Sequence, residues 1–180
     1  MSMQNQTRSS AFETSWGWVA SAFTGSGLLA LTLPKSTRVD AEESLVAQVG
    51  SIEVTLSRNN SIAKQMNEYF NGQRTSFELP LDLSIGTAFQ QAVWTAALQV
   101  PYGDRCSYAW IGSRIGALLA MRAVGSALGN NPIAVVVPCH RIVRSDGGLG
   151  GYGGGLPMKR RLLKLESTCK TSDRSILLPD

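Results

Sequence analysis

Short apolar runs dominate the first part of the chain. WGWVASAF (Trp16–Phe23) and SGLLALTLP (Ser26–Pro34) are separated by a glycine-containing turn, which predicts a β-hairpin. DAEESLVAQVG (Asp40–Gly50) and SIAKQMNEYFNG (Ser61–Gly72) place apolar residues at helical spacing. Each of these two segments begins with a capping residue, Asp40 or Ser61, and ends in glycine, which predicts two helices. We therefore expect an N-terminal α/β domain over residues 1–80, built from an antiparallel sheet with helices.

Helical spacing predominates after residue 86. FELPLDLSIG (Phe77–Gly86) is extended and contains proline, as is typical of a linker. TAFQQAVWTAALQV (Thr87–Val100) predicts a helix capped by Thr87, with Phe89 and Val93 on one face. YAWIGSRIG (Tyr108–Gly116) and LAMRAVGSALG (Leu119–Gly129) predict two short helices around a tight turn, the outline of a helix-turn-helix. The whole chain is therefore expected to be α+β.

The remaining segments alternate between apolar and flexible. The apolar run before Pro138 predicts a buried strand that stops there, because proline donates no hydrogen bond to a sheet. The loop SDGGLGGYGGG (Ser145–Gly155) lacks the strand-to-helix context of a phosphate-binding loop. PMKRRLLKLE (Pro157–Glu166) predicts an amphipathic helix with proline in its first turn. We expect a mainly α domain over residues 86–167 and a flexible tail over 168–180.

The charge is distributed unevenly. Residues 1–85 contain six Lys and Arg against eight Asp and Glu, whereas residues 86–180 contain eleven against five. This asymmetry favours contact of the second half with an anion such as nucleic acid, although a solvated basic face is the alternative. No apolar run reaches membrane-spanning length and the first ten residues lack a signal-peptide core. We therefore expect a cytoplasmic protein, or a nuclear one in a eukaryote.

The cysteine content argues against a disulfide framework. Cys106, Cys139 and Cys169 have no regular spacing, which favours a reducing compartment. The chain has one histidine, and the cysteines form no metal-ligand pair, so neither a structural zinc nor another cofactor is expected.

Cys139 stands beside that histidine, His140. A nearby imidazole can accept the thiol proton, directly or through water, and leave the attacking thiolate. Such a base needs an acceptor for its other nitrogen, and Glu166 on the last predicted helix is a candidate. The alternative is that Cys139 is a small buried apolar residue, as free cysteines usually are.

The stretch GNNPIAVVVPCHRIVRSDGGLGGYGGG resembles the O6-alkylguanine-DNA alkyltransferases. The resemblance extends upstream through GTAFQQAVWTAALQVPYGDRCSYAWIG and MRAVGSALGNNP and downstream to LLKLE, covering Gly86 to Glu166. It implies a suicide repair protein that flips O6-alkylguanine out of double-stranded DNA and transfers the alkyl group to its own cysteine. It also implies no cofactor, no membrane association and a monomer, with cooperative assembly on DNA left open.

The resemblance assigns the catalytic roles one by one. Cys139 corresponds to the alkyl acceptor, His140 to the base acting through a water, and Glu166 to the residue that orients the base. Asn131 corresponds to the asparagine that tethers the helix-turn-helix to the active-site segment. Tyr108 corresponds to the tyrosine that protonates the departing guanine.

The resemblance also implies a DNA-contacting set and a substrate pocket. Arg122 corresponds to the arginine that enters the base stack in place of the flipped nucleotide, and Tyr152 walls the alkyl pocket. The further DNA contacts expected are Ala123, Gly129 and Tyr108, and the further pocket positions are Gly153 and the backbone near Val137 and Ile142. Taken singly, each residue has an ordinary explanation, such as a helix C-cap for Asn131.

Three positions depart from the family pattern. Gly153 replaces a polar residue that helps to hold O6, Leu118 stands where the turn often has proline, and Ala134 replaces a proline near the pocket. Two other functions remain as alternatives. One is a lesion-binding protein that transfers no alkyl group, whose known representatives carry tryptophan in place of Cys139. The other is a hydrolase with a Cys-His-Glu triad, which predicts turnover and no DNA affinity; a transcription regulator using the same helices is a weaker possibility.

Overall fold

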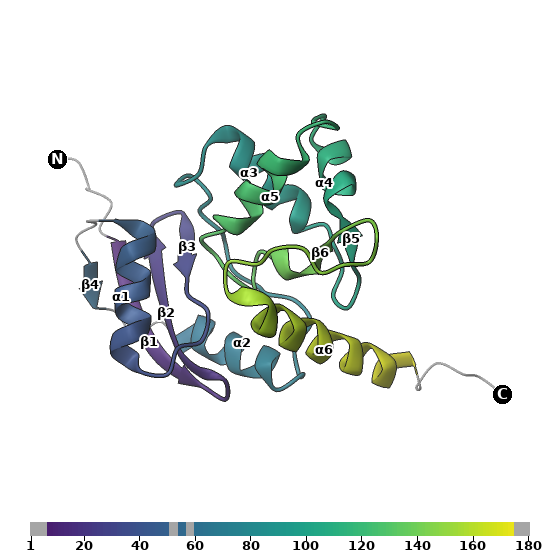
Figure 1. Cartoon of the computed structure of the whole chain (residues 1–180). Coiled ribbons are helices and arrows are strands. Elements are labelled where there is room, and N and C mark those ends of the chain that lie inside the picture. Colours follow the sequence, from purple (N-terminus) through teal and green to yellow (C-terminus); the bar gives the residue numbers. More distant parts are fainter. Residues whose placement is uncertain (1–6, 51–53, 57–59, 175–180) are drawn as a thin grey trace. The chain divides into compact units, whose positions relative to one another are not determined.

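The structure is a computed structural model that describes residues 7–50, 54–56 and 60–174 (Figure 1). The chain separates into two compact units. The first extends through Gly86 and includes Pro132–Ala134, and the second consists of Thr87–Asn131 and the chain from Val135 onward. No helix within the described ranges is long and apolar enough to cross a membrane.

A four-stranded sheet organises the first unit, in the order β3-β2-β1-β4. Strands β2 (Gly17–Thr24) and β3 (Gly27–Leu31) are antiparallel, which confirms the predicted hairpin. Strand β1 (Thr7–Thr14) pairs antiparallel with β2, and the short β4 (Val54–Leu56) pairs parallel with β1. Strands β1, β2 and β3 form the antiparallel sheet expected from the sequence, and the short β4 is an unpredicted parallel addition. The sequence did not predict β1, because most residues of TRSSAFET are small or polar and form no apolar run.

Two helices accompany this sheet. Helix α1 (Arg38–Val49) packs on β2 and contributes Ala41, Leu45 and Val49 to the core (Figure 1). The predicted N-cap was wrong: Thr37 caps the helix, and Asp40 is the third helical residue of a capping box. In α2 (Asn60–Phe70), Ser61 likewise lies inside the helix instead of capping it. At α1 the error arose because a second polar residue nearby, Thr37, was equally able to cap.

The segment expected to be a linker makes ordered contacts with β3. The Leu28 amide donates to the Pro80 carbonyl at 2.9 Å, and the Asp82 amide donates to Leu28 at the same distance. On its other side, the Leu31 amide donates to Pro132 at 2.8 Å. Segments distant in the sequence therefore complete this unit around β3.

Helices dominate the second unit. Helix α3 (Ala88–Ala97) begins after Thr87, whose side chain accepts from the Gln90 amide, so the predicted cap is confirmed. Helix α5 (Met121–Gly129) is tied to α3 by the Trp94 indole, which donates to the Ala127 carbonyl at 2.8 Å. Helix α6 (Gly155–Arg174) has Pro157 in its first turn, as predicted. It also continues past residue 168, where a flexible tail was expected, because no glycine or proline interrupts it there.

Helices α4 (Tyr108–Arg114) and α5 pack against each other as the predicted helix pair. Gly112 permits their close approach, since a Cβ there would lie 2.6 Å from Met121 Cε and 3.0 Å from the Ala117 carbonyl oxygen. Gly116 ends α4 with a φ of +69°, so the turn is made without the usual proline. Leu118, at the position of that proline, is 66% exposed.

Candidate active site

The apolar run before Pro138 forms a turn and not the expected strand. Val135 adopts a φ of +72°, and the Cys139 amide donates back to the Val137 carbonyl at 2.8 Å. A left-handed valine costs about 1–2 kcal/mol, but the whole run is buried and its packing holds the conformation. The prediction of burial was therefore right, but within the described residues pairing with a strand is limited to the bridge between Ile133 and Leu31, and the chain turns at Val135 and Val136. The turn leads directly into the 3-10 helix η1 (Cys139–Arg141).

Cys139 begins η1 and is only 7% exposed. The Asn131 side-chain amide donates to Cys139 Sγ at 3.1 Å and to the Val137 carbonyl at 2.9 Å. Burial raises the pKa of Cys139, while the Asn131 hydrogen bond and the charge of Lys159 act in the opposite direction. The resting sulfur is therefore a thiol whose surroundings stabilise the thiolate once a base removes the proton.

His140 and Glu166 form a fully buried pair, with His140 Nε2 2.8 Å from Glu166 Oε1. Burial lowers the pKa of His140, although Glu166 opposes this effect. Burial by itself would raise the pKa of Glu166, but hydrogen bonds from His140 and Arg141 outweigh it and lower that pKa to about 2. The geometry therefore provides an ionised carboxylate that orients a neutral imidazole.

The Arg141 guanidinium donates hydrogen bonds to both oxygens of the Glu166 carboxylate. Its Nε lies 3.1 Å and 3.0 Å from the two oxygens of Glu166, and its Nη2 lies 2.9 Å from Oε1. Nη1 donates to the Val100 carbonyl at 2.7 Å, and the Gly103 amide adds a further bond to Glu166 at 3.1 Å. The carboxylate is thereby held in one orientation by several donors.

Lys159 is a second buried cation near the cysteine. Its ammonium donates to the carbonyls of Ile142 at 2.5 Å, Leu149, and Gly151 at 3.3 Å. Burial lowers the pKa of Lys159 to about 8, although the proximity of Cys139 acts in the other direction. Through these bonds, the Lys159 side chain of α6 links the glycine-rich loop to β6 (Ile142–Val143).

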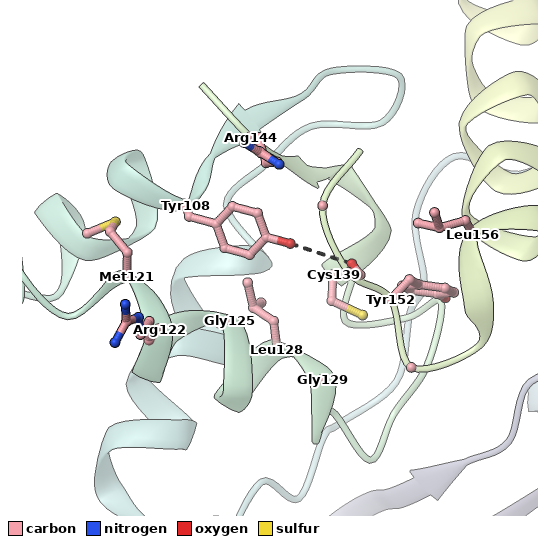
Figure 2. A pocket seen from close by; sticks show the side chains of 13 residues that line it. Tyr108, Met121, Arg122, Gly125, Leu128, Gly129, Cys139, Arg144, Tyr152 and Leu156 are labelled. Carbon is pink, nitrogen blue, oxygen red and sulfur yellow. Dashed lines mark hydrogen bonds between the residues drawn. The ribbon is translucent and has the colours of Figure 1, made fainter. Parts of the chain in front are cut away.

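A pocket of about 870 Å³ opens beside the sulfur. Figure 2 shows the Tyr108 hydroxyl directed toward the wall formed by Cys139 and Tyr152, with Arg122 on the opposite side. Tyr108 donates to the Gly151 carbonyl at a long 3.5 Å, and burial raises its pKa, so the hydroxyl keeps its proton. Gly150 fits against this ring only as glycine, since its φ is +68° and a Cβ would lie 2.5 Å from the Tyr108 oxygen.

The expected site residues are divided between the pocket and its support. The pocket wall includes Tyr108, Arg122, Gly129, Cys139, Tyr152 and Gly153. Asn131, His140 and Glu166 lie behind Cys139 and are not part of that wall. Ala123 is exposed on α5, also outside the wall.

The backbone groups expected to contact substrate have partners of their own. The Val137 carbonyl accepts from Asn131 and from the Cys139 amide, and the Ile142 carbonyl accepts from Lys159. Among the departures, Gly153 packs closely enough that a Cβ would lie 3.1 Å from the Gly129 carbonyl oxygen. Ala134 lies in the first unit, where its amide donates to Leu31.

Sequence reasoning missed Arg141 and Lys159. The spacing of α6 contained a signal for Lys159, because Lys159, Leu162, Leu163 and Glu166 follow the i, i+3, i+4, i+7 pattern of one helix face. All four are buried. No comparable signal marks Arg141, whose burial depends on the position of α6. Within the described part of the chain, no cluster of His, Cys, Asp and Glu could hold a metal ion.

A family model, curated relatives and solved structures match this chain, and the three kinds of match agree with one another. The family model described as 6-O-methylguanine DNA methyltransferase, DNA binding domain, matches residues 88–168. A methylated-DNA–protein-cysteine methyltransferase of Mycobacterium bovis is 52% identical over 112 residues, 62% of this chain and 67% of the relative. The inducible enzyme of Bacillus subtilis is 45% identical over 104 residues, 58% of each chain. The crystal structure of Mycobacterium tuberculosis OGT in complex with DNA superposes with a TM-score of 0.77 at 40% identity, covering 90% of this chain and 94% of that one.

Proposed function

Since this chain belongs to the methylated-DNA–protein-cysteine methyltransferase family, we propose that it repairs O6-alkylguanine in double-stranded DNA by transferring the alkyl group to Cys139. The observation that carries the assignment to this residue is the setting of its sulfur. Cys139 Sγ accepts a hydrogen bond from Asn131 and lies on the wall of the pocket that also contains Tyr108. The proposed nucleophile, Cys139, and the proposed proton donor, Tyr108, therefore line the same pocket.

The chemistry follows from the bond that must break. The alkyl carbon is sp3, so transfer is a displacement in which a carbon–sulfur bond forms as the carbon–oxygen bond breaks. His140 takes the Cys139 proton, through an intervening water, and Tyr108 gives its proton to the guanine that leaves. Glu166 stabilises the imidazolium that forms. The thioether product resists hydrolysis, so each molecule reacts once.

The DNA side of the reaction assigns roles to the helix-turn-helix. The alkylated oxygen lies inside the duplex, so the nucleotide must leave the base stack at a cost of a few kcal/mol. Arg122 is exposed on α5 at the edge of the pocket and fills the vacated space, which offsets part of that cost. Ala123 and Gly129 line the approach to the DNA. Tyr152 and Gly153 bound the alkyl pocket, whereas Val137 and Ile142 do not line it and support it through the bonds of their carbonyls to Asn131 and Lys159.

Intact-mass measurement tests this proposal directly. The protein is incubated with duplex DNA containing one O6-methylguanine, and we expect one methyl group to be added to Cys139. Cys106→Ala is the matched control, because the half-buried Cys106 thiol has a pKa raised to about 11 and does not line the pocket, so its loss should leave transfer intact. Cys139→Ala should abolish transfer. An unchanged mass of the unaltered protein would refute the function.

The same experiment separates the other candidates. DNA binding without a mass change would identify a lesion-binding protein, and catalytic turnover of an ester or amide would identify a hydrolase. We further propose that the protein acts as a monomer in the compartment that holds the genome, the cytoplasm of a bacterium or the nucleus of a eukaryote. Sedimentation with and without DNA tests the monomer and any cooperative assembly.

A further inference from the structure

Arg141 has no role in the reaction as described above, yet its buried side chain makes four hydrogen bonds close to Cys139. It is 7% exposed, forms three bonds to Glu166 and one to Val100, and lies 5.6 Å from the centre of the Tyr102 ring. A buried guanidinium is costly unless its charge is compensated, and here the compensating group is also the partner of His140. The cation therefore acts on the base through a shared carboxylate.

The His140–Glu166 pair has two ways to neutralise the buried carboxylate. The pair can bind a proton, which gives an imidazolium that cannot accept another from Cys139. Alternatively, a second cation can bind the carboxylate and leave the imidazole neutral. Arg141 provides that cation, because its Nη2 and His140 Nε2 both contact Glu166 Oε1, at 2.9 Å and 2.8 Å.

We infer that Arg141 takes the place of a proton on the buried His140–Glu166 pair, and thereby keeps His140 neutral and able to accept the Cys139 proton. Arg141 is thus a positioning residue, and its consequence for alkyl transfer rests on the proposed function. Three successive residues of η1 therefore supply the nucleophile, the base and the group that keeps the base available.

The charges around the imidazole support this assignment. Glu166 on α6 favours the protonated ring, whereas Arg141 on η1 and Lys159 on α6 disfavour it, and burial adds to their effect. The neighbouring thiol of Cys139 and the hydroxyl of Tyr152 have pKa values raised by burial, so both are neutral at rest. Of the two cations, Arg141 is the one whose side chain donates to the Glu166 carboxylate.

The single histidine makes the test unambiguous. Imidazole NMR signals of isotopically labelled protein can come only from His140, so its protonation can be followed against pH without DNA. In the unaltered protein we expect the ring to titrate below the ordinary pKa of histidine, because burial disfavours its charged form. In Arg141→Gln the carboxylate should recruit a proton instead, so that the ring is protonated at about pH 7. Arg141→Lys keeps the charge and should fall between the two.

Single-turnover alkyl transfer provides the second readout. In Arg141→Gln the rate near pH 7 should fall about tenfold for each pH unit by which the His140 titration moves above 7, and it should recover as the pH rises. Arg74→Gln removes an arginine from Glu68 in the first unit and should change neither the titration nor the rate.

Two outcomes would overturn the inference. One is a His140 that is already protonated near pH 7 in the unaltered protein, a measurement that holds even if Arg141→Gln does not fold. The other is a titration unchanged in Arg141→Gln with a rate lowered equally at all pH values, which would indicate support of the fold alone. Failure of the proposed function is distinguishable, because then no variant transfers an alkyl group whatever the His140 titration shows.

Discussion

The two units bury different kinds of polar groups. Within the described residues of the first unit, the buried polar side chains are hydroxyls, one amide and one carboxylate, namely Thr7, Ser9, Thr14, Ser21, Thr32, Gln65 and Asp82. In the second unit they are His140, Arg141, Lys159 and Glu166, all of which are ionisable. Hydroxyls and amides need only a hydrogen-bond partner when buried, whereas charges need both partners and compensation. The buried polar groups of the first unit are thus mostly neutral, whereas those of the second unit are charges gathered around Cys139.

The largest effect should come from breaking the buried charge network. Glu166→Gln leaves Arg141 without its counter-charge, so we expect a loss of about 3–5 kcal/mol in the free energy of unfolding, measured by urea denaturation, and severe loss of alkyl transfer. Glu68→Gln is the control, because Glu68 forms a partly exposed pair with Arg74 and should cost about 1 kcal/mol or less. Equal losses of unfolding free energy in Glu166→Gln and Glu68→Gln would contradict the contrast between the two units.

Acid should reproduce much of this loss. The pKa of Glu166 is lowered from 4.5 to about 2, so the unfolded chain binds a proton that the folded protein does not. The resulting stabilisation is present above about pH 4.5 and disappears as the pH falls toward 2, a change of about 3 kcal/mol. Unfolding curves of Glu166→Gln should lack this component, and parallel pH profiles for the two proteins would refute it.

Lys159→Met should have an intermediate effect. Removing the ammonium leaves the buried carbonyl of Ile142 and the partly buried carbonyls of Leu149 and Gly151 without this donor, which costs about 1–3 kcal/mol. We expect faster hydrogen exchange in the glycine-rich loop and slower alkyl transfer. Lys164→Met on the exposed face of α6 should change stability by about 0.5 kcal/mol or less. Unaltered exchange in the loop would show that Lys159 does not hold it.

A pair of glycine substitutions separates backbone strain from collision with Tyr108. Gly147 and Gly150 have φ values of +85° and +68°, so alanine at either costs about 1–2 kcal/mol. A Cβ at Gly147 meets nothing within 4 Å, whereas one at Gly150 lies 2.5 Å from the Tyr108 oxygen. Thermal unfolding should show similar losses, but only Gly150→Ala should slow alkyl transfer. Equal transfer rates in the two variants would contradict a role for the Tyr108 hydroxyl in alkyl transfer.

The smallest effect should come from the buried carboxylate of Asp82 in the first unit. Asp82 accepts from the Thr24 hydroxyl at 2.5 Å and from the Ser84 amide at 3.0 Å. Asp82→Asn weakens these bonds, so we expect a loss of about 1 kcal/mol in the free energy of unfolding and an unchanged rate of alkyl transfer. A large fall in the transfer rate would show that the first unit does more than support.

The sequence by itself determined the features that depend on neighbours along the chain. The hairpin of β2 and β3, the Thr87 cap, and the helices α4 and α5 follow from spacing and turn residues that act locally. The resemblance around PCHR identified the family, because it rests on residue identities and not on conformation. The same local reasoning placed two caps at the wrong residue and ended α6 too early, since several polar residues there could end or begin a helix.

Only the tertiary structure decided what surrounds the sulfur. The apolar run before Pro138 forms a turn with a left-handed Val135 because packing, and not local preference, selects its conformation. Arg141 and Glu166 are 25 residues apart, and only the docking of α6 against η1 joins them in one buried network. The energy of a buried charge depends on partners brought from elsewhere in the chain, so no local pattern reveals it.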